Sequence, residues 1–307
     1  MSSGVPGTPP RLVSFGEALT DMVRVEGTTW QAQPGGAGWN VARAAAALRL
    51  PSAFAGTISQ DCFGDAIWHA STQSQLDVRF LQRVNKPPLL AIVHETHPPQ
   101  YFFVGTDSAD LSFDPALLPT GWDIDLPWAH FGGISLAREP LASCLLALAR
   151  HLKTRGTRIS YDPNYRNAMT PGYRTMLAAM VALADVVKVS DEDLQGLLPE
   201  MSTAQALAAL HQWNPTARVL HTHGSAGATL WHEGVAVHCP AFAVEVVDTV
   251  GAGDASIAGL ICSLMESEHA DNAQHLRWSS ACGAAACLAR GPSPPSRVQV
   301  ARLVQAE

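Results

Sequence analysis

The chain has 307 residues, of which 47% are hydrophobic and 15% are charged, so it has ample apolar content for a sizeable core. Its net charge of −7 at pH 7 comes without a Lys/Arg-rich stripe, which argues against nucleic acid as a partner. No stretch reaches the roughly 18–20 apolar residues of a membrane span, and the six cysteines are scattered without a CxxC spacing, so we expect a cytoplasmic protein with reduced thiols.

The first elements are strands around one alanine-rich helix. Residues 1–10 carry no charge and no apolar run, so we expect a disordered N-terminus rather than a signal peptide, followed by a single domain over residues 11–307. Residues 11–23 (RLVSFGEALTDMV) predict a strand that Gly16 breaks. Residues 40–50 (NVARAAAALRL) are typical of a helix that starts near Asn40.

Two further strands predict an insertion. Residues 88–95 (PLLAIVHE) and 100–106 (QYFFVGT) are joined by THPP, which favours a hairpin-like unit over a helical layer. We expect strands within about 17–32 and 88–106 to form a small sheet that closes over a ligand and excludes water. Such a sheet leaves an apolar face, so we expect two chains to pair through it as a homodimer.

From Trp128 onward, strand patterns alternate with helical patterns. This alternation predicts a mostly parallel sheet covered by helices on both faces, which is a three-layer α/β/α domain. Ligands of such sheets bind beyond the carboxyl ends of the strands. We therefore expect the chemistry near Asp162, Ser190 and Gly224, and at the GAGD turn of residues 251–254.

The stretch Gly251–Ala252–Gly253–Asp254 precedes an apolar helical pattern. Glycines allow a tight turn, and the free amides of a helix N-terminus stabilise an anion. An acid in that turn could take a proton from a neighbouring hydroxyl, a combination that fits phosphoryl transfer. A plain glycine turn with an Asp near a helix start is the structural alternative.

Other glycine-rich turns narrow the choice. Residues 34–46 (PGGAGWNVARAAA) open a helix, and residues 223–228 (HGSAGA) end a strand. GxxxxGK[ST] and GxGxxG are both absent, which excludes a P-loop and leaves a dehydrogenase almost without support. His221 and His223 would share one face of a strand, but no carboxylate or cysteine stands at ligand spacing beside them, so we assign them a structural role.

The pair GGAGWNVARAAAALRL and DTVGAGDASIAGL resembles the two signatures of the ribokinase-like PfkB carbohydrate kinases. GEALTD, GGISLAREP, ISYDPNYR, DVVKVSDEDL, HTHGSAGA and SSACGAAACLARGPSP follow in that family's order and most resemble bacterial fructokinases. The resemblance covers nearly the whole chain and implies the family's α/β/α fold with a small β-sheet lid.

The resemblance implies a role for each matching residue. Asp254 would be the general base, Arg166 would lie near the transferring phosphate, and the anion hole would be formed by the amides of Gly251, Ala252 and Gly253. The implied sugar-binding residues are Asp21, Gly35, Gly36, Trp39, Asn40 and Asn164. The implied nucleotide contacts are Ser190, Thr222, Gly224, Gly227, Thr249 and Cys282. Asp193 would organise Mg²⁺ through water, and Asp248 would belong to a potassium-binding loop.

Several of these residues also have a structural interpretation. Asp21 could be a solvated acid at a strand end, and Arg166 could pair with a surface acid. Thr249 could be β-branched packing, and Asp193 could serve the dipole of a helix N-terminus.

Two departures from the family concern the sugar side of the site. Gly38 and Trp39 replace a Pro–Ala pair, and the Trp39 ring either narrows the sugar pocket or packs away from it. Gly105 and Val104 stand where relatives that phosphorylate 2-keto-3-deoxygluconate carry an Arg and an aromatic residue, which favours a neutral sugar.

The resemblance thus implies an ATP-dependent kinase that converts fructose to fructose 6-phosphate with Mg²⁺ and, where the loop binds it, K⁺. The alternatives are another neutral sugar, a nucleoside or a 2-keto-3-deoxy sugar acid as acceptor, or a sugar- or nucleotide-binding regulator without turnover. The expected partners are a small sugar and ATP, with no nucleic acid and no membrane.

Overall fold

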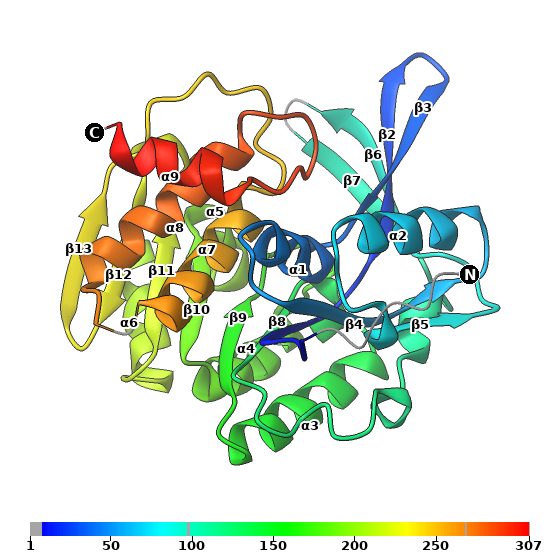
Figure 1. The fold of residues 1–307 in the computed structure, drawn as a ribbon, viewed down its shortest axis with the longest axis horizontal. Coiled ribbons are helices and arrows are strands. Elements are labelled where there is room, and N and C mark those ends of the chain that lie inside the picture. The colour runs from blue at the N-terminus through cyan, green and yellow to red at the C-terminus, as the bar shows by residue number, and fades with distance from the viewer. Residues whose placement is uncertain (1–7, 97–98, 268, 307) are drawn as a thin grey trace.

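The computed structural model describes residues 8–96, 99–267 and 269–306, and within them the strands form two separate sheets (Figure 1). Most of the segment for which we predicted disorder, residues 1–7 of 1–10, lies outside the described residues. No helix of the described part is long and apolar enough to cross a membrane.

The main sheet has nine strands in the described part of the chain. Their spatial order is β13 (Val235–Cys239), β12 (Ala228–His232), β11 (Arg218–Thr222), β10 (Val186–Ser190), β9 (Arg158–Asp162), β8 (Trp128–Gly132), β1 (Leu12–Phe15), β4 (Ser52–Ser59) and β5 (Leu81–Val84). All neighbours from β11 to β5 pair in parallel, whereas β12 and β13 are antiparallel.

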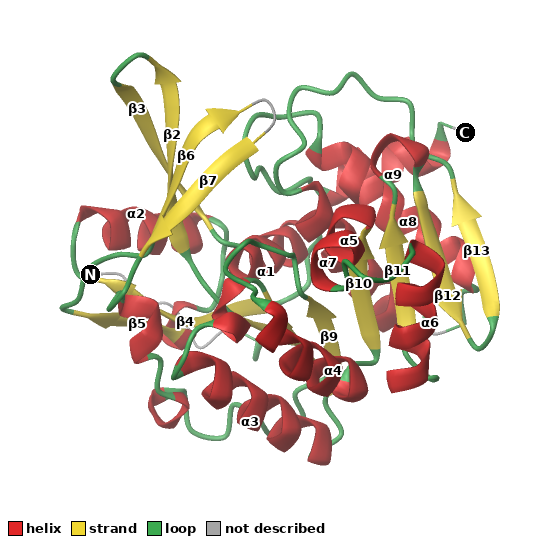
Figure 2. Ribbon diagram, turned by 180° about the vertical axis from the view of Figure 1, so that it is seen from behind, coloured by secondary structure: helices red, strands yellow, loops and turns green. Residues whose placement is uncertain are grey.

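Helices cover both faces of this sheet because the strand side chains alternate (Figure 2). Val186 packs on one face, and its neighbour Val187 packs on the other. The first face carries α1 (Ala37–Ala47), α7 (Ala252–Glu266), α8 (Asn272–Ala286) and α9 (Arg297–Gln305). The second face carries α3 (Leu141–Thr154), α4 (Arg174–Leu183), α5 (Asp191–Leu197) and α6 (Thr203–Trp213).

Shorter elements complete the body. Helix α2 (Cys62–Gln73) packs against β4 and α1. Single 3₁₀ turns occur at Val78–Phe80, Ala109–Ser112, Pro115–Leu117, Ile134–Ala137, Pro171–Tyr173 and Gly224–Ala226. The predicted three-layer α/β fold with a smaller separate sheet is confirmed.

The small sheet has the order β3 (Thr29–Gly35), β2 (Leu19–Glu26), β6 (Leu90–Thr96) and β7 (Pro99–Val104). Its β2–β3 arm projects away from the body (Figure 1). The predicted break at Gly16 is where the chain leaves the main sheet at β1 and enters the small sheet at β2. Because β2 begins and β3 ends beside α1, the small sheet brings its residues to the rim of the main sheet.

Two local features differ from the predictions. Helix α1 begins at Ala37 rather than near Asn40, because Gly36 takes the N-cap position with a φ of 115°. The β12–β13 hairpin was not predicted; Glu233 and Gly234 turn it with φ values of 51° and 77°, which is the paired left-handed geometry of a tight hairpin.

Candidate functional site

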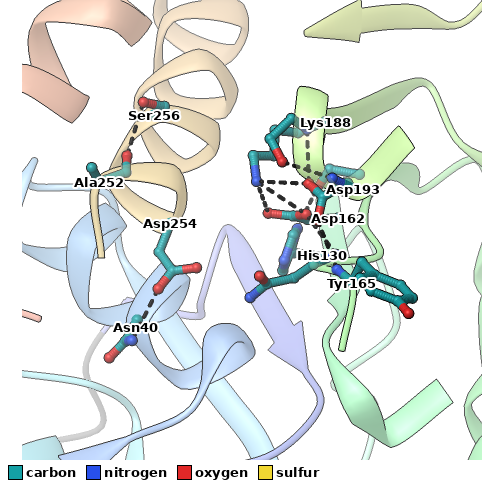
Figure 3. A network of polar contacts seen from close by, with 12 residues as sticks. Asn40, His130, Asp162, Tyr165, Lys188, Asp193, Ala252, Asp254 and Ser256 are labelled. Carbon is teal, nitrogen blue, oxygen red and sulfur yellow. Dashed lines mark hydrogen bonds and ion pairs between the residues drawn. The ribbon is translucent and has the colours of Figure 1, made fainter. Parts of the chain in front are cut away.

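The polar side chains gather at the carboxyl ends of the central parallel strands. Asp162 ends β9, Ser190 ends β10 and Thr222 ends β11. The N-terminus of α7 comes to the same edge and carries Asp254, which faces the cluster of Asp162, Lys188 and Asp193 (Figure 3). This is the edge at which the strand–helix alternation placed the chemistry.

The N-terminus of α7 is built from backbone alone. Gly251 is the N-cap with a left-handed φ of 83°, and no side chain caps the helix. A Cβ at Gly251 would lie 3.1 Å from Cα of Pro292, so the close approach of the two loops also favours glycine. The Ala252 amide donates to the Thr249 carbonyl at 3.2 Å and closes the turn. Apart from that of Ala252, the amides of the first helical turn have no intrahelical partner and are available to an anion.

A lysine that the sequence analysis missed lies beside this turn. A Cβ on Gly253 would come within 3.2 Å of the Lys188 Nζ atom. Lys188 is buried, and its Nζ lies 3.2 Å from Asp162 and 3.5 Å from Asp193 (Figure 3). Burial opposes the charge, but these carboxylates and Asp254 raise the pKa of Lys188 above its usual range. A permanent positive charge therefore lies next to the expected anion hole.

The two carboxylates that flank Lys188 differ in their surroundings. Burial raises the pKa of Asp162 to about 7 against the opposing effect of Lys188, and its Oδ2 has no hydrogen-bond partner among the described residues. Burial also acts on Asp193, but Lys188 and the amides of Ser190 and Tyr165, at 2.8 and 2.7 Å, hold its pKa below the usual value. Asp193 is thus a fixed anion, whereas the Oδ2 of Asp162 lacks a hydrogen bond within the described structure and lies 3.2 Å from the Lys188 ammonium.

Asp254 is held by a residue from the first glycine-rich segment. The Asn40 Nδ2 donates to Oδ2 of Asp254 at 2.9 Å, and both side chains are buried (Figure 3). Burial raises the pKa of Asp254 to about 6, against the lowering effects of Asn40, Lys188 and Arg166. Asn40, which was expected to contact a sugar, donates one hydrogen bond from Nδ2 to Asp254, and its buried Oδ1 has no hydrogen-bond partner among the described residues.

Arg166 connects the small sheet to this centre. Its guanidinium donates to the carbonyls of Asn164 and Tyr165, at 3.2 and 2.7 Å, and lies 5.6 Å from the ring centroid of Tyr101 on β7. Its positive charge lowers the pKa of both Asp21 and Asp254, so it acts on both carboxyl groups. Within the described residues, Arg166 therefore does not form the surface ion pair that was considered for it.

Asp21 lies against the glycines of the first segment. Burial raises its pKa to about 6, against the effect of Arg166, so it is not a solvated strand-end acid. A Cβ at Gly35 would lie 2.1 Å from the Asp21 Oδ2, and one at Gly36 would lie 2.3 Å from the Glu17 carbonyl oxygen. Both glycines are therefore required for the close approach of β2 to β3 and α1.

Glu17 is a second buried acid that the sequence analysis did not select. Its Oε2 accepts hydrogen bonds from the Ser135 amide and hydroxyl at 3.2 and 2.7 Å, and burial raises its pKa. Its charge also raises the pKa of Asp254. Glu17 thus joins the end of β1 to the turn after β8 and adds negative potential near the centre.

Two expected ligand contacts are corrected. Trp39 has 0% exposure, its indole N–H donates to Ser71 of α2 at 2.8 Å, and its ring packs among Ala42, Phe54 and Ile67. It therefore packs the body and does not roof a pocket. Cys282 also has 0% exposure; it lies between α7 and α8, where a Cβ on Gly259 would come within 2.5 Å of its Sγ, so it cannot touch a nucleotide.

The residues expected on the nucleotide side lie along the next strand ends. Ser190 caps α5, and Thr222 ends β11. Gly224 and Gly227 take φ values of 55° and 98° in the turn that follows, and the His223 amide donates to the Gly227 carbonyl at 2.8 Å. This turn presents backbone close to the strand edge.

Asp248 joins two loops. Its Oδ1 accepts the Val250 amide at 3.1 Å, and its Oδ2 accepts the Gly291 amide at 2.8 Å. The loop before α7 is thereby fixed to the loop after α8.

Sequence signals for the missed residues differ in strength. Lys188 interrupts the apolar run DVVKVS, which is a visible signal because a lysine in a buried strand needs an anionic partner. Tyr101 and Glu17 carry no such signal, because their partners come from distant segments.

Comparison with known proteins shows the family to which the chain belongs. The model of the pfkB family of carbohydrate kinases matches residues 10–298. The fructokinase of Klebsiella pneumoniae is 34% identical over 292 residues, which cover 90% of this chain and 93% of that protein. A structure of Vibrio cholerae O395 fructokinase with fructose, ADP and potassium ion has a TM-score of 0.86 at 27% identity and covers 97% of this chain and 99% of its own. Aminoimidazole riboside kinase from Salmonella enterica, with its riboside and an ATP analogue, has a TM-score of 0.82 at 27% identity and covers 96% and 99%.

Proposed function

Because the chain belongs to the pfkB family of carbohydrate kinases, we propose that it transfers the γ-phosphate of ATP to fructose and forms fructose 6-phosphate. The observation that carries this proposal is the buried Asp254 carboxyl at the uncapped N-terminus of α7, with Asn40 on one side and Lys188 nearby. A base and an anion site next to each other are what phosphoryl transfer to a hydroxyl requires.

The proton movement follows from the pKa of Asp254. At a pKa of about 6 the group is ionised at neutral pH and can accept a proton from the sugar hydroxyl. The hydroxyl oxygen then bonds to the γ-phosphorus as the bond to the bridging oxygen of ADP breaks. The first-turn amides of α7 and the ammonium of Lys188 stabilise the charge on the transferred group.

Magnesium fits the cluster at Asp162. Asp162 Oδ2 is a buried carboxylate oxygen that lacks a hydrogen bond among the described residues and lies 3.2 Å from the Lys188 ammonium, and Mg²⁺ prefers oxygen ligands and its own waters. Asp193, whose oxygens also accept backbone amides, remains the proposed contact with the waters of Mg²⁺, and we propose that Asp162 shares this contact. Bound there, the ion would neutralise phosphate charge. Asp248 and its two loops are the proposed K⁺ site.

A neutral acceptor is supported by the surroundings of Gly105. The neighbouring cation, Arg138, pairs with Asp110 and donates to the Gly105 carbonyl and to the Ser108 hydroxyl. Since its charge is balanced by a buried carboxyl group, no free cation is offered here to the carboxylate of an acid sugar. A riboside is the second candidate, because the Salmonella riboside kinase shares the fold over nearly the whole chain.

We further propose that the small sheet closes over the sugar and pairs two chains in a homodimer in the cytoplasm. Exposed apolar side chains on this sheet support the pairing: Val25, Trp30, Phe102 and Val104. Six free cysteines support a reducing compartment.

The proposal is tested by measuring ADP release over a panel of fructose, other neutral sugars, ribosides and 2-keto-3-deoxy sugar acids. We expect fructose to give the highest kcat/KM, with Asp254→Asn inactive on every acceptor. Preference for a riboside would favour the second candidate, and ATP binding without turnover of any acceptor would favour a regulator.

A further inference from the structure

Three side chains outside the proposed reaction meet between α5 and β11. His221 and His223 project from the same face of the β11 end, with ring centroids 4.1 Å apart. Asp191, the first residue of α5, lies with its Oδ1 2.8 Å from Nε2 of His221 and its Oδ2 3.3 Å from Nδ1 of His223. The carboxylate that the local sequence did not offer to the histidine pair is therefore supplied by the preceding strand–helix unit.

We propose that Asp191, His221 and His223 form a binding site for a divalent transition-metal ion such as Zn²⁺ or Co²⁺. One candidate ligand atom from each residue lies within 4.8 Å of the others, so a small adjustment of the side chains brings all three into contact with one ion. Two imidazole nitrogens and one carboxylate oxygen suit Zn²⁺, Co²⁺, Ni²⁺ or Cu²⁺, whereas Mg²⁺ prefers oxygen ligands alone.

The surroundings of His223 orient it for this role. Its Nε2 lies 3.0 Å from Oγ1 of Thr229 on β12, and that hydroxyl lies 3.2 Å from Nδ1 of His238 on β13. A hydrogen bond from Nε2–H to Thr229 leaves the lone pair of Nδ1 directed at the Asp191 carboxylate. Metal-bound histidines are commonly held in this way through their second nitrogen.

The exposure of the three side chains suits a metal, and a metal-bound imidazole must be in its neutral form. The Asp191 side chain is 55% exposed and that of His223 is 22% exposed, whereas that of His221 is 3% exposed. The cluster is thus closed on its inner side, at His221, and open to solvent on its outer side. An ion can enter from the solvent side and keep water ligands there.

The test is equilibrium dialysis of the purified full chain, after chelation, against Co²⁺ and Zn²⁺ without nucleotide, so its result does not depend on the proposed kinase reaction. We expect a site that gives Co²⁺ its visible absorption and that keeps its ion in excess Mg²⁺. His223→Gln and Asp191→Asn should each weaken binding at least ~10-fold, since even the loss of an outer partner costs that much. Circular dichroism verifies that both variants are folded.

The matched control is His151→Gln. His151 lies 2.9 Å from Asp123 in an exposed histidine–carboxylate pair with one imidazole only, so its loss should leave Co²⁺ affinity unchanged. Equal Co²⁺ binding by the parent and by folded His223→Gln and Asp191→Asn would overturn the proposal. An equal loss in His151→Gln, or displacement of Co²⁺ by Mg²⁺, would also overturn it, because the binding would then be non-specific or purely to carboxylates.

Discussion

Replacing Asn40 by Ala removes the hydrogen bond that most lowers the pKa of Asp254. A hydrogen bond to a charged group contributes ~1.5–3 kcal/mol, and one pKa unit corresponds to ~1.4 kcal/mol. The pKa of Asp254 should therefore rise from about 6 to roughly 7–8 in the variant. At pH 7 the ionised fraction, and with it kcat, should fall ~2–10-fold and recover at higher pH.

The assay is the pH profile of kcat at saturating sugar and ATP. Saturation separates the effect on the base from any sugar contact that Asn40 makes, because a lost sugar contact raises KM. The matched control is Asn214→Ala: Asn214 donates to the carbonyls of Val181 and Ala184 at 2.9 and 2.8 Å and contacts no carboxylate in the described structure. It should lower the Tm and leave the acidic limb of the profile unmoved.

A profile of Asn40→Ala that keeps the wild-type acidic midpoint would refute this reasoning. It would mean either that Asp254 is not the group that titrates in the profile or that the Asn40 contact does not affect its charge.

Three further substitutions test the electrostatics and the packing. The folded-state pKa of Asp254 is raised from 3.8 to about 6, so ionising this group costs stability as pH rises through 6. In urea melts, Asp254→Asn should therefore stabilise the fold by up to about 3 kcal/mol at pH 8 and leave its stability unchanged near pH 3.5. Lys188→Met leaves Asp162 and Asp193 without their buried cation and should lower the free energy of unfolding by ~3–5 kcal/mol. Adding Asp162→Asn to this variant should restore part of the loss. If Lys188→Met is as stable as the wild type, the ion-paired cluster is contradicted. Trp39→Ala should lower the free energy of unfolding by ~3–5 kcal/mol and leave the KM for the sugar within about twofold. A changed sugar preference at an unchanged Tm would show that Trp39 lines the sugar pocket instead.

Periodicity and turn residues predicted the layers because they depend on local sequence. The strand–helix alternation predicted the sheet, and Gly16 marked the passage between the two sheets. The direction in which a large apolar side chain packs is not determined by local sequence. Trp39 follows two glycines near the site, yet its indole N–H bonds to Ser71 on α2, a distant segment that fixes where the ring lies.

The part of the site that could be predicted from the sequence is the part formed by motif residues. The charge of Arg166 acts on both Asp21 and Asp254, and the glycines beside these two acids allow the close approach that their segments need. The Lys188 cluster and the Asp191–His221–His223 cluster depend on which strand ends become neighbours, and that follows from the sheet order rather than from any one segment.

The most direct test of the account is the turnover number of Asp254→Asn with fructose and ATP, measured beside its ATP affinity. General-base catalysis is worth ~10²–10⁴-fold, so kcat should fall by at least ~100-fold while ATP binding stays within about threefold and the chain stays folded. A variant that keeps more than about a tenth of the wild-type kcat would contradict the role of Asp254 as the base.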